Sequence, residues 1–217
     1  MSAREPLSRD RVVGEALRIV DEEGLAALSM RRLGAAMGVE AMSLYHHVPN
    51  KAALLDAVVE AIMVEDVDHI APPDGPWTER LVWIASGYRR LLLRHPNAVA
   101  LVATRPLTTS GSMRIVERCL DELVRGGLPA PEALAALNAA VVWTLGYVVA
   151  EVGRLPGAAP AATHEETGEV MASLAPHEFP VLTAAVAATT WGLPDGEFTF
   201  GLEAVVRGLE AVLSDPG

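Results

Sequence analysis

Apolar side chains recur every three to four residues along most of the chain, and no segment shows the strict alternation of apolar and polar residues typical of a β-strand. This spacing places apolar side chains along one face of a helix. Proline and glycine separate the periodic segments, most clearly in residues 72–76 (PPDGP). We therefore expect an all-α protein in which an N-terminal domain, residues 1–52, is joined by a helix over 50–68 to a larger helical domain, residues 69–217.

Two short helices on either side of a tight turn are expected in residues 29–51, SMRRLGAAMGVEAMSLYHHVPNK. Ser29 can cap the first helix by accepting a hydrogen bond from a free N–H group. Leu33 and Met37 share one face of that helix, and Gly38 supplies the permissive backbone that ends it. The second helix has apolar positions and a terminating proline: Val39, Leu44, Val48 and Pro49. This is the pattern of a helix-turn-helix unit, whose second helix can lie in the DNA major groove.

Further helices follow from the same periodicity. A helix capped by Ser8 and stopped by Gly24 is expected to pack across the helix-turn-helix and complete a three-helix core. Asn50 can cap the connecting helix, and a short segment lies between Pro96 and Pro106. In the larger domain the expected helices cover residues 77–93, 112–125, 131–155, 176–190 and 199–213, and residues 156–169 are expected to form a loop.

Two of these helices have apolar residues on more than one face. Residues 131–155 and 199–213 also carry interspersed small residues, among them Ala140, Gly146 and Gly208. A helix that is apolar nearly all round must be buried on nearly all sides, and in a domain of this size a second subunit is the natural cover. We therefore expect a homodimer. The alternative is that both helices are simply central to one monomer.

The charges are unevenly distributed along the chain. The net charge is −11, but residues 1–51 contain seven basic and seven acidic residues, whereas residues 52–217 contain ten and twenty-one. A neutral N-terminal domain permits DNA binding without demanding it, because phosphate contacts favour a basic surface. The single cysteine, Cys119, excludes an internal disulfide and fits a reducing cytoplasm. The sequence has no apolar signal region and no apolar run of membrane-spanning length, so we expect neither export nor a membrane partner.

The segment SMRRLGAAMGVEAMSLYHHVPNKAALLDAV resembles the DNA-binding region of the TetR family of bacterial transcriptional repressors, and most closely the tetracycline-repressor branch. Residues 103–106 (ATRP) and 198–210 (FTFGLEAVVRGLE) carry further similarity, so the resemblance covers nearly the whole chain. It implies a repressor that pairs the helices near 131–155 and 199–213 with those of a second subunit in a four-helix bundle. Such a dimer binds a near-palindromic operator in double-stranded DNA and is released by a small-molecule effector. Its two half-sites lie ~34–36 Å apart, or a multiple of that distance.

The residues expected to contact DNA lie at the start of the first helix and on or just after the second helix. In the second helix, Ala41 and Met42 can touch thymine methyl groups, and Ser43 can hydrogen-bond to several bases. Because Ala41 and Met42 depart from the tetracycline repressor, its operator is not carried over to this chain. The resemblance implies phosphate contacts by Tyr45 and Lys51. The remaining candidates are Met30 and Arg31 in the first helix and His46 and His47 in the second, with Arg32 as a weaker one that an acidic partner could occupy.

Eight residues from different segments could line one effector cavity with apolar walls and a few polar groups: Val67, Ile84, Tyr88, Leu101, Thr104, Arg105, Trp143 and Tyr147. Ordinary core packing is the alternative role for these side chains. The resemblance favours Thr104 and Arg105, because they match a drug-contacting segment of the tetracycline repressor. The positions that hold the drug and its magnesium there fall on Val67, Ile84 and Leu101. We therefore expect a more apolar effector, with no metal ligand and no cofactor.

No catalytic residues are expected. The sequence lacks a GxxxxGK phosphate loop, a GxSxG motif and an HExxH zinc helix. His46 and His47 are adjacent and would point about 100° apart on a helix, which does not suit one shared metal ion. A transcriptional activator and a DNA-binding protein whose second domain serves only to dimerise remain alternatives to the repressor. A helical enzyme or carrier is the remote one.

Overall fold

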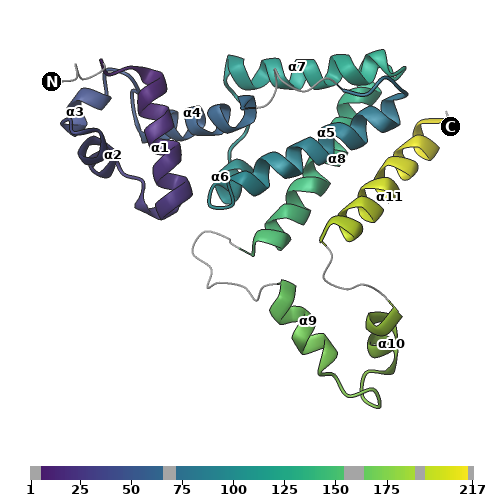
Figure 1. Ribbon diagram of the computed structural model, residues 1–217. Coiled ribbons are helices and arrows are strands. Elements are labelled where there is room, and N and C mark those ends of the chain that lie inside the picture. Colours follow the sequence, from purple (N-terminus) through teal and green to yellow (C-terminus); the bar gives the residue numbers. More distant parts are fainter. Residues whose placement is uncertain (1–5, 66–71, 154–163, 189–193, 215–217) are drawn as a thin grey trace.

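A computed structural model of the chain describes residues 6–65, 72–153, 164–188 and 194–214, and every regular element in these ranges is a helix. The prediction of an all-α protein is therefore confirmed. Figure 1 shows a small N-terminal group of helices beside a larger one, and we call these the head (residues 9–64) and the body (residues 77–214). The head contains α1 (Arg9–Glu23), a 3-10 turn (Leu25–Ala27), α2 (Met30–Met37), α3 (Ala41–Leu44) and α4 (Lys51–Val64). The body contains α5 (Trp77–Arg94), α6 (Val99–Thr104), α7 (Ser110–Arg125), α8 (Ala130–Val152), α9 (His164–Ala172), α10 (Pro180–Ala188) and α11 (Pro194–Ser214).

The helix ends of the head follow from local chemistry. The side chains of Ser8, Ser29 and Asn50 each accept a hydrogen bond from a backbone N–H three residues later, as the sequence predicts. Gly38 ends α2 in the left-handed conformation, with φ +65°, and Gly24 follows α1 with φ +85°. Both glycines adopt a backbone that other residues rarely reach, so the chain turns at these two positions.

Several predicted boundaries are wrong. Residues 164–169 form the first turns of α9 rather than part of a loop, and the helices expected at 176–190 and 199–213 begin at Pro180 and Pro194. The α9 segment, HEETGEVMA, has apolar residues only at its end, so its periodicity is too short to indicate a helix. The connecting helix ends at Val64, and the remaining residues expected for it, 66–68, lie outside the described residues.

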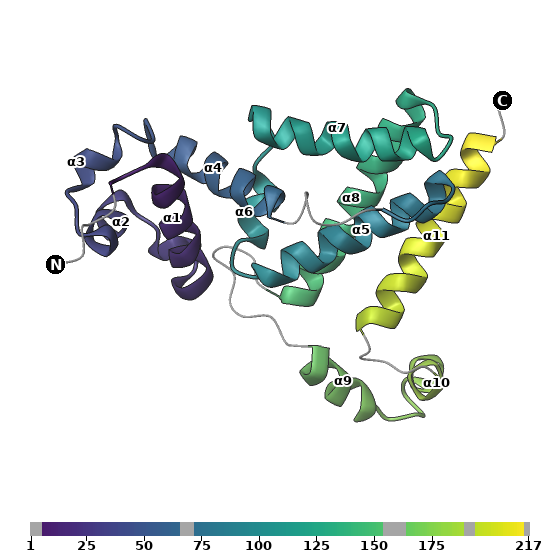
Figure 2. The same cartoon turned by 45° about the horizontal axis from the view of Figure 1, so that its top comes forward.

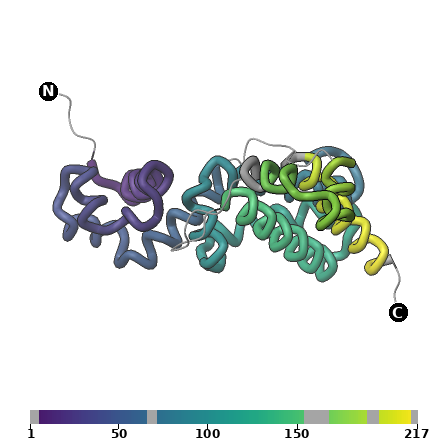
Figure 3. Tube along the Cα trace, turned by 90° about the horizontal axis from the view of Figure 1, so that it is seen from below, coloured from purple at the N-terminus to yellow at the C-terminus, as the bar shows by residue number. Residues whose placement is uncertain are grey.

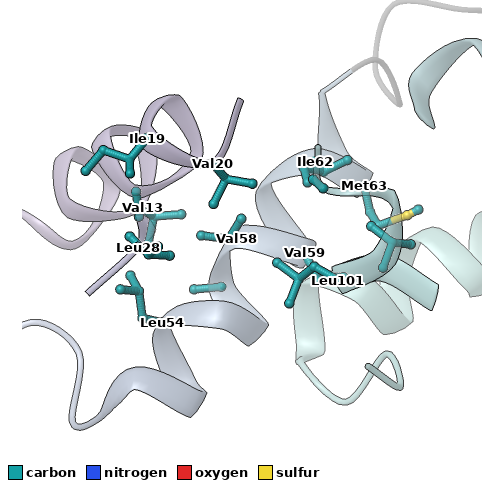
Figure 4. Close-up of a cluster of buried hydrophobic side chains, with 14 of the residues drawn as sticks. Val13, Ile19, Val20, Leu28, Leu54, Val58, Val59, Ile62, Met63 and Leu101 are labelled. Carbon is teal, nitrogen blue, oxygen red and sulfur yellow. The ribbon is translucent and has the colours of Figure 1, made fainter. Parts of the chain in front are cut away.

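One apolar core runs from the head into the body through α4. Figure 4 shows Leu54 and Val58 of α4 beside side chains of α1, and Val59 and Met63 beside Leu101 of α6. All five of these side chains are buried. Helix α4 therefore contributes to both sides of one continuous core.

A second core lies within the body, where α5, α7, α8 and α11 pack against one another. Its fully buried members include Leu81, Leu123, Ala136 and Leu202. The molecule is elongated, with the start of the chain at the head and its end at the far side of the body (Figures 2 and 3). Helix α8 is the one helix in the described part of the chain that is long and apolar enough to cross a membrane, and it packs against α5, α6, α7 and α11.

Helices α9 and α10 stand apart from the rest of the body in both Figures 1 and 2. They pack against each other, and apolar side chains such as Val170 and Val181 are exposed on them. Apolar side chains are also exposed on α8 and α11, where Val142 is 69% and Phe200 78% exposed. A single chain therefore leaves uncovered apolar surface on these four helices.

Candidate nucleic-acid interface and effector cavity

The predicted DNA-contacting residues lie on α2, on α3, in the turn after it and, for Lys51, at the first position of α4. Helices α2 and α3 are at the end of the head away from the body (Figure 1). Met42, Tyr45 and the remaining exposed candidates point to solvent: Arg31, His46 and Lys51. Met30, Ala41, Ser43 and His47 are half-buried. Leu44 and Val48 are buried core residues, as predicted. The second helix is shorter than its apolar spacing indicates, because α3 ends at Leu44 and the following residues form turns.

Helix α3 is held close to α2 at a glycine that the sequence analysis did not single out. A Cβ atom on Gly34 would lie 2.9 Å from the Val39 carbonyl oxygen and 3.1 Å from the Ala41 backbone nitrogen. The Val39 N–H donates to the Gly34 carbonyl at 2.9 Å. Because these neighbours are backbone atoms, no side chain can be added at position 34 without moving the turn. Gly34 thus sets how α3 is presented.

Arg32 is occupied within the head. Its guanidinium makes two hydrogen bonds to the Glu23 carboxylate, one of them 3.0 Å long from Nε. This interaction lowers the pKa of Glu23 below its ordinary value. The pair joins α1 to α2 and takes Arg32 away from phosphate contact. Arg32 was the weaker DNA-contacting candidate, for which an acidic partner was the expected alternative.

A cavity of about 380 Å³ lies within the body, at the side that faces α4. Its walls are mainly apolar and come from α4, α5, α6, α7 and α8, as expected of a small-molecule site. The apolar and aromatic lining includes Met63, Trp83, Ile84, Tyr88, Leu91, Val102, Leu107, Ile115, Val116, Leu137, Val141 and Leu145. The polar and ionisable lining consists of Arg90, Arg105, Arg118, Cys119, Glu122 and Asn138.

Three of the eight predicted effector residues line this cavity: Ile84, Tyr88 and Arg105. Leu101 is instead part of the core that joins the head to the body, and Thr104 is exposed and donates to the Ala100 carbonyl of its own helix at 2.8 Å. Val67 lies outside the described residues.

Trp143 and Tyr147, which were also expected to line an effector cavity, are not in the lining of this one. Their rings stack on each other with centroids 5.5 Å apart, and both contact the ring of Phe198 on α11. Successive residues of a helix are rotated by about 100°, so Val141 and Leu145 of α8 face the cavity while Trp143 and Tyr147 face α11. The apolar residues of α8 alone do not reveal which side of the helix faces the cavity and which side faces α11.

The ionisable groups of the cavity differ in charge state. Burial raises the pKa of Tyr88 to about 12 and that of Cys119 to about 11, so both are neutral at physiological pH. Glu122 is engaged by Arg80 and Arg125. The cationic lining residues are Arg90, Arg105 and Arg118, of which Arg105 is paired with Asp56 and is the one that the sequence analysis singled out.

Polar contacts also join the body to the head, and sequence reasoning missed them. Arg105 Nε donates to Asp56 Oδ1 of α4 at 2.7 Å, and its Nη2 donates to the Ala52 carbonyl at 3.0 Å. The buried His95 lies with Nδ1 2.9 Å from Asp21 of α1 and Nε2 3.0 Å from Glu65. These partners are dozens of residues apart along the chain, so no local pattern could have found them.

A helix-turn-helix in the head, a lined cavity in the body and one helix that belongs to both define a DNA-binding regulator that responds to a small molecule. Two family models match the chain. The model for bacterial regulatory proteins of the tetR family matches residues 13–58, and the tetracyclin repressor-like C-terminal domain matches residues 71–213.

Individual relatives agree with these matches. The tetracycline repressor protein class C of Escherichia coli is 33% identical over 207 residues, which cover 94% of this chain and 91% of that protein. The HTH-type transcriptional repressor DrrR1 of Streptomyces coeruleorubidus is 32% identical over 225 residues, covering 96% and 79%. The crystal structure of the TetR family protein ActR of Streptomyces coelicolor in complex with actinorhodin superposes with a TM-score of 0.79 at 30% identity, covering 95% of this chain and 97% of that one.

The chain belongs to the TetR family, and it is a ligand-responsive, DNA-binding transcriptional regulator.

Proposed function

We propose that the protein is a homodimeric repressor that binds a near-palindromic operator and is released from it by a small, largely apolar effector. The observation that carries this proposal is the position of α4, which packs in the head core through Leu54 and lines the cavity through Met63. A ligand in the cavity therefore touches the helix that holds the DNA-reading unit. Two of its relatives, DrrR1 and the class C tetracycline repressor, are repressors, which supports repression over activation.

Pairing of two chains is supported by the uncovered faces of α8 and α11. On α8, the exposed apolar side chains Leu134 and Val142 lie eight residues apart, with the small residues Ala135 and Ala139 beside them on the same exposed side. Side chains at this spacing share a helix face. Two such helices from each chain can bury their faces together as a four-helix bundle, which joins two heads and doubles the number of phosphate contacts.

Release is proposed to occur by linkage between the two sites. The effector favours a conformation in which the distance between the two heads does not match the operator half-sites, and it therefore weakens DNA binding. DNA must weaken effector binding by the same factor, because the coupling between two sites is reciprocal. A coupling of ~1–3 kcal/mol changes the affinity roughly 5- to 150-fold. Arg105 is suited to this role, because it lines the cavity and also donates to Asp56 and to the Ala52 carbonyl of α4.

We propose further that the effector needs no magnesium. The described cavity lining contains no histidine, and its one carboxylate, Glu122, is engaged by arginines. Carboxylates and waters are the ligands that magnesium prefers. Tight tetracycline binding that depends on magnesium would contradict this part of the proposal.

The test is footprinting of the purified protein on the DNA upstream of its own gene. We expect protection of a near-palindrome whose half-sites are about one helical turn apart, and loss of protection as salt increases. Protection of every duplex alike would overturn the proposal.

A Tyr45→Ala variant tests whether the footprint depends on α3, because Tyr45 caps the C-terminal end of this helix. Tyr45 is 41% exposed and outside the core, so the variant should keep its fold and its dimer. We expect protection to disappear at protein concentrations that saturate the parent, and Tyr45→Phe to lose as much if the hydroxyl donates to a phosphate. Unchanged protection by Tyr45→Ala would contradict the proposed interface.

A further inference from the structure

The cavity carries positive charge although the protein is strongly acidic. Three arginines and one glutamate are the charged residues of its described lining, whereas the whole chain has a net charge of −11. The glutamate, Glu122, is held by Arg80 and Arg125, and the lining residue Arg105 is held by Asp56. The lining thus has more basic than acidic residues, whereas the chain as a whole has more acidic than basic residues.

Arg90 has the least compensated charge of these groups. Within the described ranges of the chain, no ion pair or hydrogen bond engages its guanidinium. Its Nη2 atom lies 3.7 Å from the point where a side chain on Gly87 would begin, and Gly87 itself lines the cavity. The guanidinium thus lies along the cavity wall on α5, about one helical turn after Gly87 and two turns after Trp83 and Ile84.

From this arrangement we infer the chemical class of the effector: an apolar, ring-sized body that carries one carboxylate, with Arg90 as the residue that binds the acid. The inference rests on the proposed effector function of the cavity. A guanidinium matches a carboxylate with two parallel N–H donors, and such charge-assisted hydrogen bonds are roughly twice as strong as neutral ones. Arg90 is exposed to solvent as well as to the cavity, so the preference for an acid comes from the geometry of the guanidinium and the apolar walls hold the rest of the ligand beside it.

Arg118 on α7 lies in another wall of the cavity. The neutral forms of Tyr88 and Cys119 add no opposing negative charge at physiological pH. A neutral ligand of the same shape would fill the apolar walls equally well but would leave the Arg90 guanidinium without a partner. The discrimination between acid and neutral analogue is therefore the property to measure.

The experiment is isothermal titration calorimetry of the full-length protein, without DNA, with anthracenecarboxylate and with anthracenecarboxamide, which differ only in charge. We expect the carboxylate to bind about tenfold or more tightly than the amide. In an Arg90→Gln variant this preference should fall to about twofold or less, while the affinity for the amide stays unchanged. Arg114→Gln is the matched control, because Arg114 is an exposed arginine on α7 that does not line the cavity.

Equal binding of acid and amide by the parent protein would overturn the inference, as would no measurable binding of the carboxylate. An equal loss for both compounds in Arg90→Gln would also overturn it, because that result indicates a packing role. Since calorimetry needs no operator, the failure of any ligand to release DNA would refute the proposed effector response and leave the acid preference standing. Conversely, operator release by acid and amide alike would keep the effector response and refute the role of Arg90.

Discussion

Cys119 is the only cysteine of the chain and lies in the wall of the cavity. Burial disfavours its thiolate and raises the pKa of the thiol from an ordinary value of 9.0 to about 11. Since the thiolate is the reactive form, the folded protein should keep this group unreactive at neutral pH. Its reactivity therefore reports on the closure of the cavity.

We expect iodoacetamide to alkylate Cys119 far more slowly in the folded protein than in the chain unfolded in urea, at any pH between 7 and 9. The folded rate should rise about tenfold for each pH unit and level off only near pH 11, because the raised pKa keeps the thiol protonated below that value. Mass spectrometry of quenched samples measures both rates. Equal rates for the folded and unfolded chains would show that Cys119 is not shielded.

At the same scale, local residue chemistry was readable from the sequence where partners are close along the chain. Ser29 and Gly38 cap α2 as expected, and Leu44 is buried as expected. The exclusion of Arg32 from the DNA-facing surface was not settled, because its partner Glu23 belongs to another helix. The position of Arg90 in the cavity wall was also missed, because nothing in the local sequence distinguishes an arginine in a cavity wall from one in solvent.

At the scale of elements, the contact between α2 and α3 depends on Gly34. Helix propensity alone predicts that alanine at a helical glycine stabilises the fold, by up to ~1 kcal/mol. At position 34 a Cβ atom would instead meet the backbone of Val39 and Ala41. Gly14 on α1 offers the opposite case, because it is helical and exposed, and a Cβ there would meet nothing within 4 Å.

Gly34→Ala should therefore lower the free energy of unfolding by about 1–3 kcal/mol, since the turn must shift to make room. Gly14→Ala, its matched control, should raise that free energy by up to ~1 kcal/mol. Urea titrations followed by circular dichroism measure both changes, and footprinting should show weaker operator binding for Gly34→Ala alone. If the two variants changed stability in the same direction, the close approach of α2 and α3 would be refuted.

Which helices exist was largely predictable, but the side each one buries was not. The long helix α8 is apolar on several faces, so its sequence does not separate the cavity-lining Val141 and Leu145 from Trp143 and Tyr147, which stack toward α11. Helix α9 was missed because few of its residues are apolar. Among the described elements, α10 is the only one against which it packs extensively. Periodicity identifies a helix only where one face is buried over several turns.

At the scale of the whole molecule, the heads can read a palindrome only if two chains are joined. The exposed apolar face of α8 and α11 is where we propose that they meet, and Val142 is 69% exposed within it. Burial of such a face is driven by the removal of apolar surface from water, and a charge at its centre opposes that burial. Dimerisation and operator binding should fail together if this face is disrupted.

Val142→Glu should convert the dimer to a monomer and reduce operator affinity about 100-fold or more, because each head then binds without the other. Light scattering after size-exclusion chromatography measures the first effect, and footprinting the second. Met113→Glu is the matched control: Met113 is 50% exposed on α7, so the same charge there should change neither property. A dimeric Val142→Glu protein would place the interface elsewhere.

The sequence by itself determined the all-α class, the helix-turn-helix with its caps and buried anchors, and a resemblance that the family matches confirm. These features depend on residues a few positions apart, whose spacing fixes which side chains share a face. Only the tertiary structure decided which residues line the cavity, that Arg105 and His95 bind carboxylates on or beside the head, and that Gly34 meets the next helix. Those contacts join distant segments, and the packing of whole helices selects them, because a local pattern fixes a helix but not its neighbours.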